Sequence, residues 1–326
     1  MTPDLVEIAE RYRLYAAREA RDVSAIYASW ATGLAEDEAL LRLLTPLPRL
    51  KQQPNLVFAS ARWTGCPVAD FGVFRGWMLG RWPDIESTIL ARSTQTNEAA
   101  RCSALVAALA GIDGPVALLE VGASAGLCLY PDRYSYRFQH DSGIAALDPA
   151  DGTSSVVIPC QLGGGIPIPA RLPEVVWRAG IDQSPIDVRD MEEMRWLETL
   201  IWPGHPERVA RLHAAARIAA ADPPHLRRGD LVDLLASTAE WAPRDATLVV
   251  FHSAVLGYLA AERREEFRRI VGELDAVWVS NEAPGLLPDV TAKVPAEVDV
   301  GGRFILARDG EPVALTGPHG QSIDAL

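Results

Sequence analysis

The chain has 326 residues, 48% hydrophobic and 23% charged, so it can bury a large core, either as one large domain or with an added subdomain. Its 43 acidic residues against 31 basic ones give a net charge of -12, which argues against nucleic acid and anionic membranes as partners. The four widely spaced cysteines exclude a disulfide framework, and no metal site is expected. An acidic amino terminus and the lack of an apolar run of membrane-spanning length lead us to expect a cytoplasmic protein.

The first part of the chain has a helical pattern. Apolar residues at three- and four-residue steps from Leu5 onward predict one long helix that ends near Gly33. Shorter helices are expected over residues 36–44 and from Pro54 onward, and residues 92–101 contain helix-start signals. We therefore predict a helical amino-terminal subdomain over residues 1–91 and a second domain over residues 92–326.

From Val116 onward the pattern changes to strands that alternate with helices. Strands are predicted at 116–121, 175–182, 247–251 and 276–280, and helices at 190–201, 206–221 and 262–274. The runs 134–138 and 155–159 are interpreted as a hairpin, and 303–307 with 312–316 as a terminal antiparallel pair. This alternation predicts an α/β fold, a Rossmann-like, mostly parallel sheet of seven strands with helices on both faces.

The turn over residues 122–126 follows the first predicted strand and has two interpretations. Gly122 and Gly126 let the backbone bend sharply and approach a ligand closely, as in a cofactor-binding loop. The same letters match a Gly-x-Ser-x-Gly nucleophile elbow with Ser124 at its apex. The order of the acids favours the cofactor, because Glu120, the glycine-rich turn, Asp182 and Asp230 occupy, in this order, the places where a nucleoside needs a close loop and hydrogen-bond acceptors.

The residues Leu118-Leu-Glu-Val-Gly-Ala-Ser-Ala-Gly126, Gly180-Ile-Asp182 and Gly229-Asp230 resemble motifs of the class I S-adenosylmethionine-dependent methyltransferases. The resemblance implies S-adenosylmethionine as cofactor. It also implies a set of cofactor-binding residues: Glu120, Gly122, Ala123, Ser124, Gly126, Asp182, Asp230 and Leu231.

Polar residues at the expected strand ends and at the start of the core are candidates for catalysis and acceptor binding. His252 or Glu282 is the candidate base, because both follow predicted strands at the carboxyl edge of the sheet. Gln95, Asn97 and Asn281 are candidates for substrate binding. The loop after the fourth expected strand lacks the Asn/Asp-Pro-Pro-aromatic pattern used on amino groups of bases and glutamine, so methylation of a base amino group is disfavoured. The helical subdomain, with Gln95 and Asn97 at its junction, would enclose a small-molecule acceptor and exclude water.

One departure from the methyltransferase pattern concerns spacing. The stretch from Gly126 to Asp182 is far longer than the roughly 20 residues that separate loop and acid in dinucleotide-binding folds. Either residues 130–174 form an inserted hairpin, or another acid such as Asp141 binds the ribose. We favour the insertion, because Asp182 ends a convincing strand.

Two other functions stay open. A serine hydrolase would use Ser124 as nucleophile with His252 or His319 as base, although the helical stretch before Val116 is unlike that fold. A non-catalytic nucleotide-binding module of the same fold would bind a ligand without turnover.

A second resemblance covers nearly the whole chain. It is similar to a bacterial domain family of unknown function, through the blocks Gln53-Pro-Asn-Leu, Arg92-Ser-Thr-Gln-Thr-Asn-Glu98, Gly122-Ala-Ser-Ala-Gly126, Pro185-Ile-Asp187, Ile201-Trp-Pro203, Val250-Phe-His-Ser253 and Ser280-Asn-Glu282. This resemblance implies that the chain folds into an ordered structure, but it implies no particular reaction.

Overall fold

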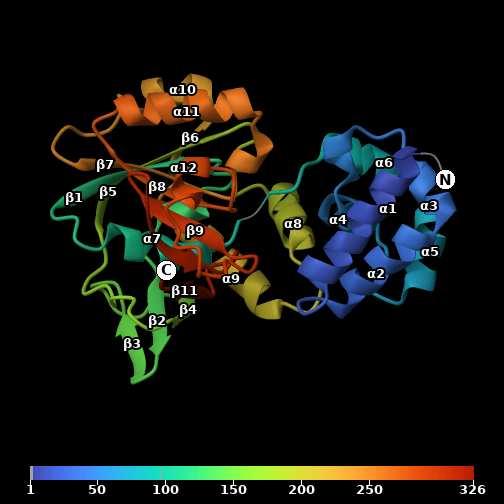
Figure 1. The fold of residues 1–326 in the computed structure, drawn as a ribbon, viewed down its shortest axis with the longest axis horizontal. Helices are drawn as coiled ribbons and strands as arrows, with labels where there is room; N and C mark the ends of the chain where they lie inside the picture. The colour runs from blue at the N-terminus through green and yellow to red at the C-terminus, as the bar shows by residue number, and fades with distance from the viewer. Residues whose placement is uncertain (1–2, 96) are drawn as a thin grey trace. The chain divides into compact units, whose positions relative to one another are not determined.

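A computed structural model describes residues 3–95 and 97–326. The chain divides into two compact units (Figure 1). The helical unit contains residues 1–96 and 191–210, and the sheet unit contains residues 97–190 and 211–326. The helical unit therefore differs from the expected segment 1–91, because the chain returns to it after the middle of the sheet unit.

The helical unit packs its helices around aromatic side chains. Its helices are α1 (Pro3–Tyr15), α2 (Ala25–Glu36), α3 (Glu38–Leu44), α4 (Pro54–Trp63), α5 (Phe71–Gly80), α6 (Trp82–Ala91) and α8 (Met191–Leu200). The ring of Phe58 on α4 is fully buried and lies 5.0 Å from the ring of Tyr27 and 5.6 Å from that of Trp30. Burial of these large rings stabilises the unit.

The long amino-terminal helix expected from the sequence is interrupted. A π-helical turn over Ala16–Ala20 follows α1, and α2 begins after Ser24, whose hydroxyl accepts a hydrogen bond from the Tyr27 amide. Ser24 is therefore a helix cap inside a run whose apolar spacing alone suggests continuity.

The segment 191–210 is tied to the helical unit by hydrogen bonds. The Arg62 guanidinium donates to the carbonyls of Thr199 and Ile201, both at 2.7 Å. The Trp196 indole donates to the Ser93 carbonyl at 3.1 Å. Helix α9 (Pro206–Ala221) begins in this unit and continues into the sheet unit.

The sheet unit is a mixed α/β structure with a mostly parallel sheet, as expected, but the described residues form eleven strands and not seven. Their order is β3-β2-β4-β11-β10-β9-β8-β7-β1-β5-β6. The strands are β1 (Pro115–Val121), β2 (Ser135–His140), β3 (Gly143–Leu147), β4 (Val157–Leu162), β5 (Glu174–Asp182), β6 (His225–Arg228), β7 (Thr247–Ser253), β8 (Val277–Glu282), β9 (Phe304–Arg308), β10 (Glu311–Thr316) and β11 (Ser322–Asp324).

Strand β1 lies at the point where the strand order reverses. Parallel strands β5 and β6 follow each other on one side of β1, and parallel strands β7 and β8 on the other. In such open sheets, ligands bind beyond the carboxyl ends of the strands at this switch point. A ligand site is therefore expected at the loops after β1 and β7.

Helices cover both faces of this parallel region. Figure 1 shows α10 (Leu231–Ala239) and α11 (Ala261–Glu273) side by side on one face, and α7 (Cys102–Leu109) lies on the opposite face. Leu119 and Val250 point from the sheet to the α10/α11 face, where they join a core with Leu235 and Phe267. A short helix, α12 (Pro288–Thr291), follows β8.

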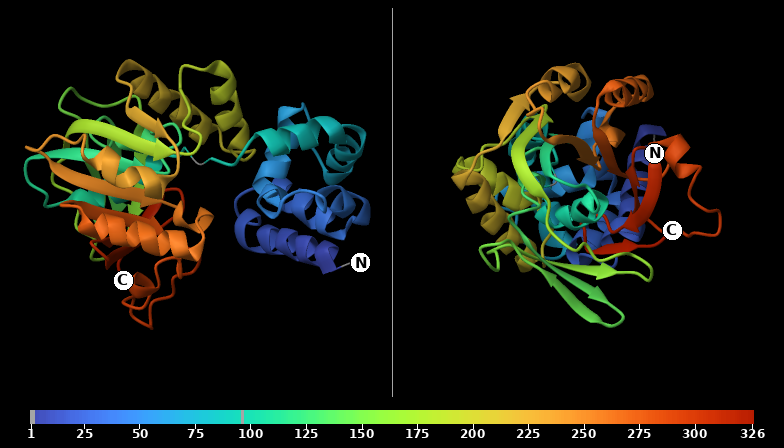
Figure 2. Two further views of the ribbon diagram at one scale, coloured as in Figure 1. Left: turned by 90° about the horizontal axis from the view of Figure 1, so that it is seen from above. Right: turned by 90° about the vertical axis from the view of Figure 1, so that its left-hand side faces the viewer.

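The segment 130–174 forms a different structure from the expected hairpin. Strands β2 and β4 pair in parallel, and the hairpin partner of β2 is β3, which the sequence analysis missed. Strand β4 in turn pairs with β11, so the segment extends the far end of the same sheet. The β2–β3 hairpin projects from it (Figure 2, right).

The terminal antiparallel pair, β9 with β10, is confirmed. The short strands β6 and β11 were not predicted from the sequence. None of the helices in the described part of the chain has the length and apolar character needed to cross a membrane.

Candidate functional site

Two strained loops meet at the switch point. Ser124, in the loop after β1, has a φ of 50°, and Ala254, directly after β7, has a φ of 56°. Residues other than glycine rarely adopt this left-handed conformation, and such strain is concentrated at functional sites. We call residues 122–126 the glycine loop and residues 254–256 the β7 loop.

Gly122 permits close contact between these two loops. Its φ is 77°, and a Cβ atom placed on it would lie 2.4 Å from Cγ2 of Val255 in the β7 loop. The amides of Gly122 and Ala123 both donate to the Ile181 carbonyl, at 2.8 and 3.1 Å. The glycine at this position is therefore required by packing against Val255 as well as by its own backbone conformation.

Asp182 at the end of β5 holds the glycine loop. One carboxylate oxygen accepts from the Ser124 amide at 2.8 Å and the other from the Ser184 amide at 2.7 Å. Asp182 is thus next to the loop in space although it is far away in sequence. Asp141, the other acid considered for the ribose, lies in the turn between β2 and β3.

Asn97 holds the loop from the other side. Its side-chain nitrogen donates to the Ser124 hydroxyl at 2.7 Å, and its side-chain oxygen accepts from the Ala125 amide at 2.8 Å. Gln95, its partner in the sequence-based substrate hypothesis, lies in the helical unit. Asn97 therefore acts on the glycine loop directly, and Ser124 is 4% exposed beneath it.

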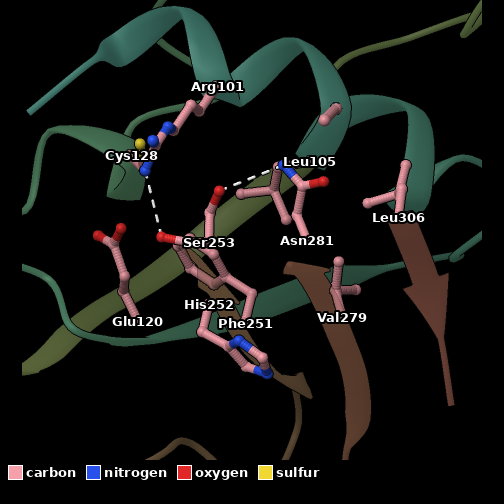
Figure 3. Close-up of a pocket in the computed structure, with 11 residues that line it drawn as sticks. Arg101, Leu105, Glu120, Cys128, Phe251, His252, Ser253, Val279, Asn281 and Leu306 are labelled. Atoms are coloured by element: carbon pink, nitrogen blue, oxygen red, sulfur yellow. Dashed lines mark hydrogen bonds between the residues drawn. The ribbon is translucent and has the colours of Figure 1, made fainter. Parts of the chain in front are cut away.

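A small cavity of about 20 Å³, enough for roughly one water molecule, lies between α7 and the sheet (Figure 3). Its lining residues come from β1, α7, β7, β8, β9 and the segments next to them, and are Arg101, Ala104, Leu105, Glu120, Cys128, Phe251, His252, Ser253, Val279, Asn281 and Leu306.

Glu120 is the unsatisfied polar group of this cavity. It is 7% exposed, and its Oε2 atom is buried without a hydrogen-bond partner. Burial raises the pKa of this carboxyl well above its ordinary value; the nearby Cys128 adds to the rise and Arg101 opposes it. A buried carboxylate oxygen without a donor is costly, so this atom is suited to a ligand that brings one.

Other polar groups of the cavity are already connected. Arg101 donates to the Ser253 carbonyl at 3.2 Å, and the Asn281 side-chain nitrogen donates to the Ser253 hydroxyl at 3.2 Å (Figure 3). Asn281 also accepts from the Thr316 hydroxyl at 2.7 Å. Asn281, a predicted substrate residue, therefore faces this cavity and is oriented by its neighbours.

Arg101 and Cys128 were not predicted from the sequence as site residues. Cys128 is buried, and a hydrogen bond from the Cys102 side chain, together with Arg101, lowers the pKa of its thiol. Arg101 closes the polar block that begins at Arg92, and Cys128 lies two positions after Gly126. The available sequence signal for both residues was that they lie close to motifs that had been predicted to form the site.

His252 and Glu282, the predicted base candidates, are paired with each other. The His252 Nδ1 atom lies 2.7 Å from a Glu282 oxygen, and the Trp278 indole donates to His252 Nε2 at 3.0 Å. His252 borders the cavity, but its ring points away from it (Figure 3) and contacts Phe267 of α11. Both ring nitrogens are occupied, so this geometry does not present His252 as a proton acceptor for a substrate.

Asp230 and Leu231 start helix α10. Asp230 accepts from the Val232 and Asp233 amides as the helix cap and forms an ion pair with Arg263 at 2.6 Å. Leu231 packs in the core beneath the helix. The described residues contain no cluster of three or more side chains that could hold a metal ion.

The fold and the site together define an α/β protein with two strained loops and an unpaired buried carboxyl at the switch point of its sheet. A family model described as an uncharacterized protein conserved in bacteria, DUF2332, matches residues 62–325, and the chain belongs to this family. Comparison with curated proteins and with solved structures found no match.

Proposed function

We propose that the sheet unit binds S-adenosylmethionine and transfers its methyl group to a small-molecule acceptor. The observation that carries the proposal is the buried, unpaired oxygen of Glu120 at the carboxyl end of the central strand, directly before the glycine loop. An ammonium or hydroxyl donor on a ligand would satisfy this oxygen.

The order of the parallel strands supports a nucleoside ligand. Numbered along the chain, the five strands β6-β5-β1-β7-β8 have the spatial order 3-2-1-4-5, which is that of Rossmann-like sheets. The glycine loop and the β7 loop lie on the two sides of the switch point. This arrangement is the basis for proposing a Rossmann-like core within the larger sheet.

In this proposal the protein mainly aligns the reactants. S-adenosylmethionine, when bound, would supply a methyl group on a sulfonium sulfur for transfer to an acceptor that gives up a proton. Glu120 and the glycine loop would hold the cofactor, while Asp182 and Asn97 fix the loop. Orientation of two reactants alone lowers a barrier substantially. Because His252 is hydrogen-bonded at both nitrogens, we assign no proton transfer to it.

The serine hydrolase is less well supported. The Ser124 hydroxyl accepts its hydrogen bond from Asn97, whereas an activated nucleophile needs a base to take its proton. His252 is engaged with Glu282 and Trp278 on the other side of β7.

Titration calorimetry of the full chain with S-adenosylhomocysteine tests the proposal. We expect wild-type protein to bind, and Glu120→Gln to weaken binding about tenfold, or about 1.4 kcal/mol, because a ligand donor favours ionisation of the carboxyl and an amide cannot ionise. Glu174→Gln is the matched control, since Glu174 is exposed at the amino end of the neighbouring strand β5. Absence of binding by the wild-type chain would refute the cofactor, and binding without methyl transfer to any acceptor tried would favour a non-catalytic module.

A further inference from the structure

We propose that Glu282 is a positioning residue that holds the β7 loop against the glycine loop. It acts from the α10/α11 face of the sheet, opposite to the face that bears the cavity. The inference deepens the proposed function, because it names the residue that sets the shape of the cofactor loop. Its structural part, the coupling of the two loops through Glu282, does not depend on the identity of the cofactor.

A single oxygen of Glu282 gathers three donors. Its Oε1 atom accepts from His252 Nδ1 at 2.7 Å, from the Val255 amide at 3.0 Å and from the Leu256 amide at 3.2 Å. The side chain is 2% exposed, and Oε2 is buried without a hydrogen-bond partner. Hydrogen bonds to a charged acceptor are about twice as strong as neutral ones, so this carboxylate is a strong anchor for two consecutive amides.

His252 orients the carboxylate. Because the Trp278 indole can only donate, His252 Nε2 accepts and the ring carries its proton on Nδ1, which points to Glu282. The ring also contacts Phe267 edge-on, with the centroids 5.3 Å apart. The imidazole is therefore held from two sides, and its position fixes that of the Glu282 oxygen.

The anchored amides belong to the residues that contact the glycine loop. Val255 is the side chain that approaches Gly122 so closely that a Cβ would lie 2.4 Å away. The residue before it, Ala254, has a φ of 56° and donates its amide to the Asn281 carbonyl at 3.0 Å. A strained backbone persists only where its surroundings stabilise it. Glu282 stabilises this one through its hydrogen bond from the amide of the next residue, Val255.

It follows that Val255 covers Gly122 only while Glu282 keeps the β7 loop in place. Loss of the carboxylate would free Val255 to move, and the glycine loop would lose the contact that packs against its first residue. A ligand that approaches the backbone of this loop would then meet a less ordered surface and bind more weakly.

Amide hydrogen exchange of the full chain, followed by mass spectrometry, tests the coupling. In Glu282→Gln we expect exchange to become about tenfold faster in residues 254–257 and also in residues 122–126. Ser280→Ala is the matched control, because Ser280 is also buried on β8 and two positions from Glu282, and we expect it to leave both regions unchanged. Faster exchange at 254–257 with unchanged exchange at 122–126 would overturn the proposal.

Val255→Ala provides a second test if Glu282→Gln does not fold. This variant keeps the carboxylate and its amide bonds but removes the two methyl groups of Val255, of which Cγ2 is the atom closest to the Cβ position of Gly122. We expect faster exchange in residues 122–126 and preserved protection at 256; unchanged exchange at 122–126 would overturn the coupling.

Calorimetry separates the two proposals. We expect Glu282→Gln and Val255→Ala each to weaken S-adenosylhomocysteine binding about tenfold and Ser280→Ala to leave it unchanged. If wild-type protein does not bind, the cofactor is refuted, and the coupling stands or falls on the exchange data.

Discussion

Gly122 and Val255 are packed so closely that no other residue fits at position 122 without displacement, since a Cβ there would lie 2.4 Å from Cγ2 of Val255. These residues belong to loops after two neighbouring parallel strands, β1 and β7. Their contact closes the switch point of the sheet, and the following predictions concern the residues that support it.

Gly122→Ala should lower the free energy of unfolding by about 2 to 4 kcal/mol, through the strained φ and the overpacking against Val255. Val255→Ala in the same chain should relieve part of the overpacking, because it removes Cγ2 at 2.4 Å and leaves Cβ at 2.9 Å. The two changes should therefore be non-additive by about 0.5 to 3 kcal/mol. Urea unfolding of both single variants and the double variant measures this coupling. Gly164→Ala is the control, because no atom lies within 4 Å of a Cβ there; simple additivity would show that the contact is unimportant.

Asp182→Ala should destabilise the protein by about 2 to 4 kcal/mol, because the Ser124 and Ser184 amides lose their charged acceptor. Thermal unfolding measures the loss. Asp141→Ala serves as the comparison, since Asp141 lies in an exposed turn and should change stability by less than about 0.5 kcal/mol. Equal effects of the two substitutions would mean that Asp182 does not anchor the loop.

The carboxyl of Glu120 should make stability depend on pH. Burial raises its pKa in the folded protein above the ordinary value of 4.5, so the folded state binds this proton more tightly than the unfolded state. Its contribution to stability is therefore complete below about pH 4.5 and is lost as the pH rises through the raised pKa.

Glu120→Gln removes this titration. The free energy of unfolding of wild type minus that of the variant should fall as the pH rises, whereas contributions of all other groups cancel to first order. Urea unfolding of both proteins at a series of pH values gives the difference. A difference that is constant with pH would mean that the carboxyl has an ordinary pKa in the folded protein.

A fluorophosphonate probe should not label Ser124. Its hydroxyl accepts from Asn97, and His252, one of the two bases considered for the hydrolase, is held by Glu282 and Trp278, so His252 is not in place to activate it. Mass spectrometry after incubation detects any adduct. Labelling that disappears in Ser124→Ala would restore the hydrolase hypothesis.

Local sequence signals predicted much of the individual structure. The continuous apolar run before Gly122 predicted β1, and glycines at positions that need a positive φ predicted the turn after it. The residues 303–307 and 312–316 are separated by only a short connection. Their antiparallel pairing could therefore be predicted from the local pattern alone. Short sequence blocks also predicted that the chain belongs to a bacterial family of uncharacterised proteins.

Other features depended on contacts between distant parts of the chain. The partners of β2 could not be chosen from its own residues, because the backbone groups along either edge of a strand can pair with any other strand. The structure places β3 on one edge of β2 and β4 on the other. Likewise, the helical pattern alone did not assign residues 191–210 to the helical unit. That assignment depends on hydrogen bonds to residues far away in sequence, from Arg62 to the Thr199 carbonyl and from Trp196 to the Ser93 carbonyl.

The candidate site shows the same division. Sequence determined which polar residues lie near the carboxyl ends of the strands, and so named Glu120, Asp182, His252 and Glu282. Only the tertiary structure decided their partners: Asp182 binds loop amides, His252 and Glu282 bind each other, and Glu120 keeps one oxygen unpaired. The physical reason is that a side chain's position depends on local strand geometry, whereas its hydrogen bonds depend on which other strands and loops pack beside it.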